Sequence, residues 1–180
     1  DRSESYEKLS NVEKAARIIY LNKTCYNGLF RVNQAGQFNS PYGKYKNPNI
    51  VNRPTILAVS KYFNDNNIKI VSGDYRQALK GLRKGAFVYF DPPYLPISSS
   101  SSFTGYTENG FGYKDQVNLK EECDKLHKRG INFILSNSDH PAICELYKDY
   151  KLITLKAKRI VNSKGNKRGE INEVLVMNYN

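Results

Sequence analysis

The sequence predicts an α/β fold, because short apolar runs alternate with segments of helical periodicity from about residue 67 to the end of the chain. The clearest run, Ala86–Phe90, is apolar without interruption, which is typical of a strand buried on both faces of a parallel sheet. Such alternation implies an open sheet whose ligands bind at the carboxyl ends of its strands. Residues 1–66 lack that rhythm, so we expect two regions, 1–66 and 67–180.

Two helices and a hairpin are expected in the first region. Pro54 suits a first helical turn and predicts a helix over 54–64. Between the helices, Gln34–Gln37 reads as a turn joining two short extended arms. Five apolar residues at helical spacing predict the other helix, from Asn11 as its cap to about Lys23: Val12, Ala15, Ala16, Ile19 and Tyr20.

The second region predicts strands and helices in alternation. Apolar runs predict strands at 68–71, 86–90, 132–135, 152–155 and 173–177. Helical spacing predicts helices at 75–82, 115–128 and 141–147.

The composition is strongly basic, with 28 Lys and Arg against 17 Asp and Glu and a net charge of +11. That surplus favours a polyanionic partner such as nucleic acid, although a merely basic protein is the alternative. Three cysteines without CxxC spacing fit a reducing cytosol and argue against a disulfide framework or a zinc site. No apolar run approaches the length of a membrane span. We therefore expect a cytoplasmic protein without metal.

The strongest local signal is Asp91-Pro92-Pro93-Tyr94, directly after the run 86–90. Two consecutive prolines fix the backbone and remove two N–H donors, which leaves carbonyl oxygens free to face a cleft. Asp91 adds an acceptor and Tyr94 a flat stacking face. Two acceptors would hold an exocyclic amino group in its nucleophilic, pyramidal form, as methylation of adenine N6 requires. The alternative is a turn that only ends the strand. Five serines, 98–102, follow and are typical of a mobile lid.

Asp91–Tyr94 resembles the catalytic motif of amino-methyltransferases, and its surroundings resemble the Dam-like (D12 class) DNA adenine-N6 methyltransferases, particularly the branch with the pneumococcal GATC methylase. The resemblance implies a partial Rossmann-like S-adenosylmethionine-dependent methyltransferase sheet. It also implies an inserted helical and β-hairpin DNA-recognition region, residues 1–66. Catalytic roles follow by resemblance for Asp91, Pro92, Pro93 and Tyr94. Asp91 and the Pro92 carbonyl would engage the adenine amino group, and Tyr94 would stack on a base flipped from the duplex.

The segments Tyr26–Asn33 and Gly36–Tyr45 are similar to the DNA-reading hairpin of that family. The resemblance implies DNA contacts by Tyr26, Asn27, Leu29, Arg31, Asn33, Pro41, Lys44 and Tyr45. Tyr26 would wedge into the duplex, Asn27 would meet the orphaned thymine, and Arg31 would read guanine, whose O6 and N7 match its fork. Lys44 stands where relatives commonly carry Arg. The alternative is a hairpin that folds on itself, with its tyrosines as packing.

Ser72-Gly73-Asp74-Tyr75 resembles part of the cofactor site of the same family. The resemblance implies that Asp74, Tyr75 and Asp91 bind S-adenosylmethionine, with Asp74 accepting a hydrogen bond from its adenine amino group. Asp74 could instead cap the next helix, and one residue can do both.

Part of the family's cofactor site has no counterpart in this sequence. Family members also carry a Lys-Gly segment and a Phe-x-Gly-x-Gly loop near the amino end. The sequence holds no such loop, and Gly73, Gly81 and Gly85 are too dispersed to replace it. We expect the amino-terminal half of the same gene product, or a second polypeptide, to complete the site.

The predicted function is therefore site-specific methylation of adenine N6 in duplex DNA, with GATC as the expected sequence, by a nucleoid-associated bacterial enzyme. It would serve in restriction-modification or act as a solitary methylase. One alternative is a catalytically incomplete DNA-binding fragment of such an enzyme. Another is an amino-methyltransferase with a different substrate, such as cytosine N4, although the hairpin resemblance argues against it.

Overall fold

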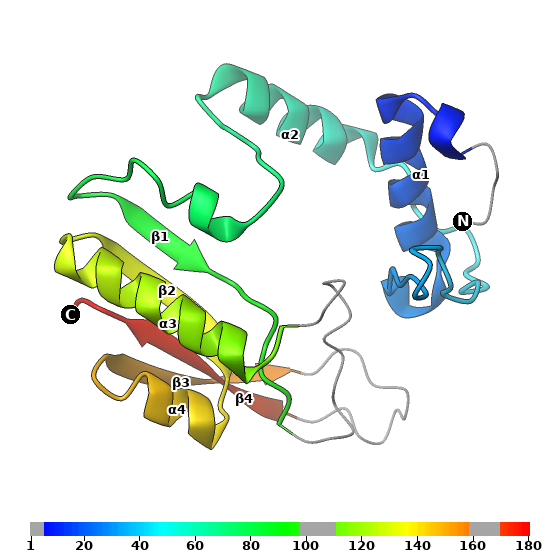
Figure 1. Ribbon diagram of the computed structural model, residues 1–180. Helices are drawn as coiled ribbons and strands as arrows, with labels where there is room; N and C mark the ends of the chain where they lie inside the picture. The colour runs from blue at the N-terminus through cyan, green and yellow to red at the C-terminus, as the bar shows by residue number, and fades with distance from the viewer. Residues whose placement is uncertain (1–5, 98–110, 159–169) are drawn as a thin grey trace. The chain divides into compact units, whose positions relative to one another are not determined.

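The computed structural model describes residues 6–97, 111–158 and 170–180. These belong to two compact units, Asp1–Ile70 and Val71–Asn180 (Figure 1). The serine run expected to form a lid, 98–102, lies outside the described residues. Across the described parts of the chain, no helix is both long enough and apolar enough to cross a bilayer.

Two helices dominate the first unit, as the sequence predicts. Helix α1 (Asn11–Thr24) follows a short 3-10 turn, η1 (Tyr6–Lys8). Its cap is Ser10, so the expected cap at Asn11 is wrong by one residue. The Ser10 hydroxyl accepts from the Glu13 N–H at 3.3 Å, and the Glu13 carboxylate accepts from the Ser10 N–H at 2.8 Å, which makes a capping box. Helix α2 (Arg53–Asp65) carries Pro54 in its first turn.

A loose hairpin follows the 3-10 turn η2 (Tyr26–Gly28). Its two arms are joined by two isolated bridges, Cys25 with Tyr42 and Val32 with Phe38, and by side-chain bonds of Arg31 to Asn39 and of Ser40 to the Leu29 carbonyl oxygen. The Asn33 side chain closes the turn, because its Oδ1 accepts from the N–H groups of Ala35 (3.0 Å) and Gln37 (2.9 Å). The predicted turn between extended arms is confirmed.

A four-stranded mixed sheet forms the centre of the second unit, in the order β1-β2-β4-β3. Strands β1 (Phe87–Phe90) and β2 (Asn132–Ser138) are parallel and joined by a crossover containing α3 (Tyr113–Lys128). Strand β4 (Glu170–Met177) runs antiparallel to β2 and to β3 (Lys151–Lys158). The α/β class is confirmed, with a sheet that is parallel only between β1 and β2.

Two elements predicted between residues 67 and 82 differ from the structure. The strand expected over 68–71 is wrong, because these residues are exposed and belong to no strand. The helix expected over 75–82 is only a 3-10 turn, η3 (Tyr75–Gln77), followed by further turns. The remaining helix, α4 (Pro141–Leu146), matches its predicted position.

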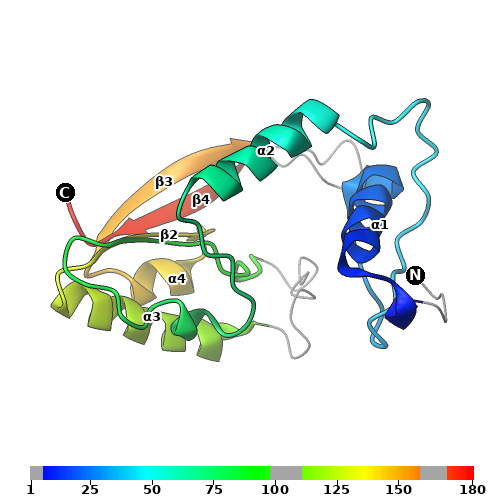
Figure 2. The same cartoon turned by 90° about the horizontal axis from the view of Figure 1, so that it is seen from above.

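Helices α3 and α4 lie on the same face of the sheet, and the core lies between them and the strands (Figures 1 and 2). Leu119, Cys123 and Leu126 on α3 are at most 2% exposed. They share a buried cluster with side chains from β1, β2, α4 and β4 that include Phe90, Phe133, Leu135, Ile143, Tyr147, Val174 and Val176. This core fixes the crossover helix against the ends of β1 and β2.

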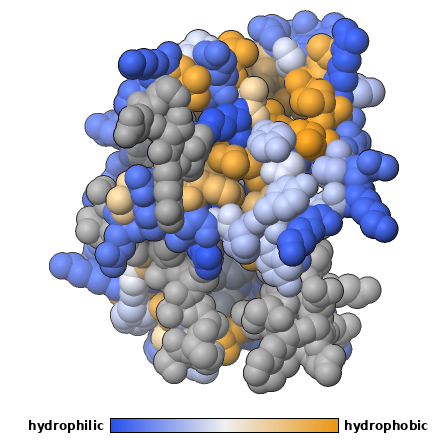
Figure 3. All heavy atoms as spheres, turned by 90° about the vertical axis from the view of Figure 1, so that its right-hand side faces the viewer, coloured by the Kyte–Doolittle hydropathy of each residue, from blue (hydrophilic) through white to orange (hydrophobic). Residues whose placement is uncertain are grey.

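Among the described residues of this unit, no helix covers the opposite face of the sheet (Figure 2). Phe87 is 55% exposed and Tyr89 58% exposed, so the expectation that β1 is buried on both faces is wrong. The physical reason is that both helices of the unit cover the other face. Apolar side chains, orange in Figure 3, also reach the surface elsewhere on the molecule among hydrophilic ones.

We expect Leu126→Ala to lower the free energy of unfolding of the second unit by about 2–5 kcal/mol, because it leaves a cavity in a core that closes around this side chain. Denaturant unfolding followed by circular dichroism measures the change. Leu155→Ala, at a side chain 44% exposed, is the control and should cost well under half as much. Equal losses in the two variants would contradict this placement of the core.

Candidate active site

A cavity of about 520 Å³ lies at the carboxyl end of β1, where an α/β sheet commonly binds ligands. Three segments of the second unit line it: residues 73–76, residues 89–93, and the start of the α3 region with Phe111, Asp115, Asn118 and Leu119. Asp74, Tyr75, Asp91, Pro92 and Pro93 therefore share one cavity, although 17 positions separate Asp74 from Asp91 in the sequence. Tyr94, which follows, is half-buried.

The end of β2 holds the Asp91 carboxylate in place. The Ser136 hydroxyl lies 2.9 Å from Asp91 Oδ1 and 3.3 Å from the Phe90 carbonyl oxygen. The Tyr89 hydroxyl donates to Ser136 Oγ at 3.2 Å. Because β1 and β2 are parallel, Ser136 reaches the position where β1 ends, and it fixes one carboxylate oxygen.

Buried polar side chains hold the residues after Asp91. Gln116 Nε2 donates to the Pro93 carbonyl oxygen at 2.9 Å, and Asn137 Oδ1 accepts from the Leu95 N–H at 3.1 Å. The two amides are joined, since Asn137 Nδ2 donates to Gln116 Oε1 at 3.0 Å. The Ser138 hydroxyl donates to the Leu95 carbonyl oxygen at 2.6 Å.

Two acceptors at this site remain unused. Among the described residues, nothing donates to Asp91 Oδ2 or to the Pro92 carbonyl oxygen. Both residues line the cavity, and Tyr94 follows them directly. Asp91 and Pro92 therefore offer two acceptors at the cavity, whereas Tyr94 is not among the residues that line it.

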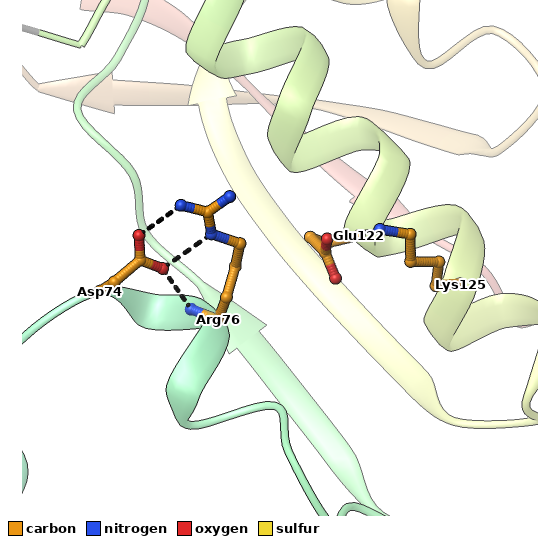
Figure 4. A network of polar contacts seen from close by, with 4 residues as sticks. All are labelled: Asp74, Arg76, Glu122 and Lys125. Atoms are coloured by element: carbon orange, nitrogen blue, oxygen red, sulfur yellow. Dashed lines mark hydrogen bonds and ion pairs between the residues drawn. The ribbon is translucent and has the colours of Figure 1, made fainter.

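Asp74 forms a bidentate ion pair with Arg76 (Figure 4). Arg76 Nε donates to Oδ1 at 2.9 Å and Nη2 to Oδ2 at 2.6 Å, while the Arg76 N–H donates to Oδ1 at 2.9 Å. These bonds lower the pKa of Asp74 to about 2, chiefly through the Arg76 side chain. Asp74 therefore caps η3, as the alternative reading of the sequence had it.

The cap leaves Asp74 room for a further ligand. A carboxylate offers about four lone-pair sites. Oδ1 accepts two hydrogen bonds and Oδ2 only one, so Oδ2 retains one acceptor site, and Asp74 lines the cavity. On α3, Glu122 forms its ion pair with Lys125 at 2.7 Å, whereas Arg76 forms its ion pair with Asp74 (Figure 4).

The cavity lining combines carboxylates with aromatic side chains. Tyr75 and Phe90 meet edge to face with centroids 6.4 Å apart, which gives the cavity an aromatic wall beside Asp74 and Asp91. The volume lies in the range of small-molecule sites. Among the residues that the structure describes, no group of three His, Cys, Asp or Glu could hold a metal ion.

The hairpin residues lie in the first unit. The Tyr26 N–H donates to the Pro41 carbonyl oxygen at 2.8 Å, so these two predicted DNA contacts are neighbours. Tyr26 is 50% exposed, and Asn27 beside it has a left-handed backbone with φ of 55°. Leu29 (36%) and Tyr45 (41%) are also exposed.

Arg31 is held so that part of its guanidinium stays available. Nε donates to Asn39 Oδ1 at 2.9 Å and Nη2 to the Asn39 carbonyl oxygen at 3.3 Å. Within the described residues, no bond engages Nη1. Asn33, by contrast, uses its side chain in the turn, and Lys44 has a positive φ of 54°.

Sequence reasoning missed how some residues act. Arg76 was not singled out, and its distance of two positions from Asp74 was the available signal. Gln116 and Ser136–Ser138 were not singled out either, although they hold the residues after Asp91. Gln116 lies three residues before Leu119 and seven before Cys123, on the buried stripe of α3, where a polar residue requires a partner.

Comparisons with known proteins identify a family for this chain. Residues 2–161 match the family model described as D12 class N6 adenine-specific DNA methyltransferase. The chain is 49% identical over 179 residues to a type II methyltransferase of Lactococcus lactis subsp. cremoris, M1.LlaDCHI, covering 99% of this chain and 63% of that protein. It is 44% identical over 181 residues to the type II methyltransferase M.MjaIII of Methanocaldococcus jannaschii, covering 99% and 62%.

A third relative is named a DNA adenine methylase. The DNA adenine methylase of Escherichia coli K12 is 32% identical over 176 residues, covering 98% of this chain and 62% of that protein. The chain thus spans less than two thirds of the length of these curated relatives.

We expect Arg76→Ala to raise the pKa of Asp74 from about 2 toward its ordinary 3.8, because the first cause of the lowering disappears. A carboxylate pKa that is lowered by folding stabilises the folded state above the unfolded pKa. Wild-type stability should therefore fall as pH drops toward 2, and the variant should lack this component. Carbon-13 NMR titration of the carboxyl group measures the shift. Lys61→Ala, which breaks an exposed pair on α2, should leave Asp74 unchanged.

Proposed function

The chain belongs to the D12 class N6 adenine-specific DNA methyltransferase family, and we propose that it carries the target-recognition and catalytic parts of a site-specific enzyme. In this proposal the enzyme transfers a methyl group from S-adenosylmethionine to adenine N6 in duplex DNA, with GATC as its sequence. Relatives named as type II methyltransferases favour a role in restriction-modification. Because its substrate would be the chromosome, we place the protein in the bacterial cytoplasm at the nucleoid.

The observation that carries the proposal is the pair of unused acceptors at the end of β1, Asp91 Oδ2 and the Pro92 carbonyl oxygen. The lone pair of an aromatic amino nitrogen is delocalised into its ring, which makes the nitrogen a poor nucleophile. Accepting both hydrogens favours the pyramidal form and aims the nitrogen at the donor. S-adenosylmethionine supplies an electrophilic methyl group on a positively charged sulfur.

Tyr94 gives the target ring a place outside the helix. An adenine N6 inside a stacked duplex cannot be approached in line, so the base must be extruded. The ring of Tyr94 stacks on it beside the two acceptors. Pro93 lies between the Pro92 carbonyl and Tyr94, and its locked φ limits how the carbonyl and the ring can move relative to each other.

The cofactor would contact residues 73–76 of the cavity lining. Asp74 offers its remaining Oδ2 site to the adenine amino group, and Tyr75 supplies an aromatic face. The two units correspond in this proposal to a DNA-recognition insertion, 1–66, and part of a Rossmann-like sheet, 67–180. The glycine-rich loop that this sequence lacks comes from the amino-terminal half of the gene product or from a second polypeptide.

The hairpin would read the duplex through its exposed residues. Tyr26 wedges between base pairs, and Asn27, Leu29 and Pro41 contact the thymines. Arg31, already oriented by Asn39, retains the two Nη1 hydrogens and one on Nη2 for guanine O6 and N7. Asn33, Lys44 and Tyr45 complete the proposed contacts, and the net charge of +11 favours the phosphates.

A second candidate is a DNA-binding fragment without methyl transfer, which the net charge of +11 and the exposed hairpin residues favour by themselves. Methyl transfer from labelled S-adenosylmethionine to a GATC duplex separates the two. The assay compares this chain with the uninterrupted product of its gene. If neither protein labels any adenine-containing duplex while DNA is still bound, the second candidate stands and the first fails.

We expect Asp91→Asn to reduce kcat by on the order of 100-fold or more in the product that is active, because one of the two acceptor atoms becomes a donor. Labelled methyl transfer under saturating DNA measures it. Asp139→Asn, which lies after β2 and does not line the cavity, is the matched control and should keep the wild-type rate. A fully active Asp91→Asn variant would contradict the assigned role.

We expect Arg31→Ala to reduce discrimination between GATC and a duplex with the guanine replaced by about 1–3 kcal/mol. Equilibrium binding of this chain to the two duplexes gives the difference. Arg53→Ala, an exposed position on α2, removes the same charge and should weaken both duplexes alike. Unchanged discrimination in Arg31→Ala would remove Arg31 from the reading of the sequence.

A further inference from the structure

Gln116 and Asn137 are both 0% exposed, and together they grip the loop after Asp91. Asn137 also accepts from the Ser138 N–H at 2.9 Å, so its Oδ1 is used twice. Turning either amide over would set donor against donor or acceptor against acceptor. The four bonds of the pair therefore fix the orientation of both side chains.

The two loop atoms that the pair grips lie on either side of Tyr94. The Pro93 carbonyl belongs to the peptide plane before Tyr94, and the Leu95 N–H belongs to the plane after it. A peptide unit is planar, so holding both planes fixes the two backbone dihedrals of Tyr94. The direction of the Cα–Cβ bond of Tyr94, which carries the ring, is thereby fixed as well.

Pro92 and Pro93 are the reason that side chains from other elements must hold this segment. Neither has an N–H, so the segment cannot be held by strand pairing through its own donors. Gln116 takes the Pro93 carbonyl and leaves the Pro92 carbonyl, one residue earlier, as the acceptor that faces no protein donor among the described residues. The Pro93 carbonyl is therefore used to hold the loop, and the Pro92 carbonyl stays available to the substrate.

We propose that Gln116 and Asn137 are positioning residues for the reaction: they fix the peptide planes on both sides of Tyr94, so that its ring and the Pro92 carbonyl are aimed before a target base arrives. This inference rests on the proposed function. It goes further in assigning a role in kcat to a helix residue that does not touch the substrate.

Gln116→Met tests the proposal, because methionine is similar in size and keeps neither donor nor acceptor. We expect kcat for methyl transfer to fall by on the order of 10–100-fold in the uninterrupted gene product. The KM for the duplex should stay at the wild-type value, because the hairpin residues lie in the other unit. With 2-aminopurine at the target position, emission should be higher than in wild type, because the extruded base loses its ordered stacking partner.

Two controls separate positioning from stability. Ser138→Ala removes the bond to the Leu95 carbonyl, which belongs to the plane beyond those flanking Tyr94, and should change kcat far less. Leu126→Ala destabilises the same helix without touching the loop. If Gln116→Met keeps the wild-type kcat, or loses no more than Leu126→Ala at an equal folded fraction, the proposal is overturned.

Gln116→Glu keeps the test decisive if Gln116→Met does not fold. A protonated carboxyl can donate to the Pro93 carbonyl and accept from Asn137, whereas the ionised form faces the carbonyl with a second acceptor. Burial raises the pKa of such a carboxyl. Activity relative to wild type should therefore be retained at low pH and lost as pH rises through that pKa. A ratio independent of pH would overturn the proposal, and a wild-type protein that transfers no methyl group would overturn the proposed function itself.

Discussion

The site depends on a shortage of backbone donors at the end of β1. Two prolines in succession cannot bond to a neighbouring strand through their nitrogens, so other elements must shape the loop. The parallel pairing of β1 with β2 supplies them, because it brings Ser136, Asn137 and Ser138 beside the residues that follow Phe90. Helix α3 adds Gln116 only because the core holds that helix against both strands.

The two kinds of polar contact around the cavity differ in how rigidly they hold it. The amide network lies where water does not reach, so each bond is strong and each lost partner is costly. The Asp74–Arg76 pair lines the cavity, is largely exposed and is screened by solvent. The loop that the amides hold is therefore set by the fold, whereas the ion pair can adjust around a ligand.

The sequence predicted most helices and strands correctly, because the spacing of apolar residues along the chain shows which side of each element is buried, and the core of the second unit contains such residues. It failed where an element depends on a partner. Residues 68–71 have the composition of a strand, but no described strand pairs with them. The capping box at Ser10 and Glu13 was readable, and Asn11 beside it was the wrong choice. By resemblance the sequence identified Asp91 and the Pro92 carbonyl as acceptors, but it did not reveal that Gln116, far along the chain, occupies the Pro93 carbonyl instead.

Among the strands that the structure describes, β1 is at the edge of the sheet, and it carries two large exposed side chains, Phe87 and Tyr89. An unpaired edge with apolar neighbours is a template for further strands from any chain that meets it. The handling of the isolated chain follows from this: its solubility should depend on concentration, and self-association through β1 would compete with the folded monomer. The strand that leads into the reactive loop is thus also the one through which the isolated chain would self-associate.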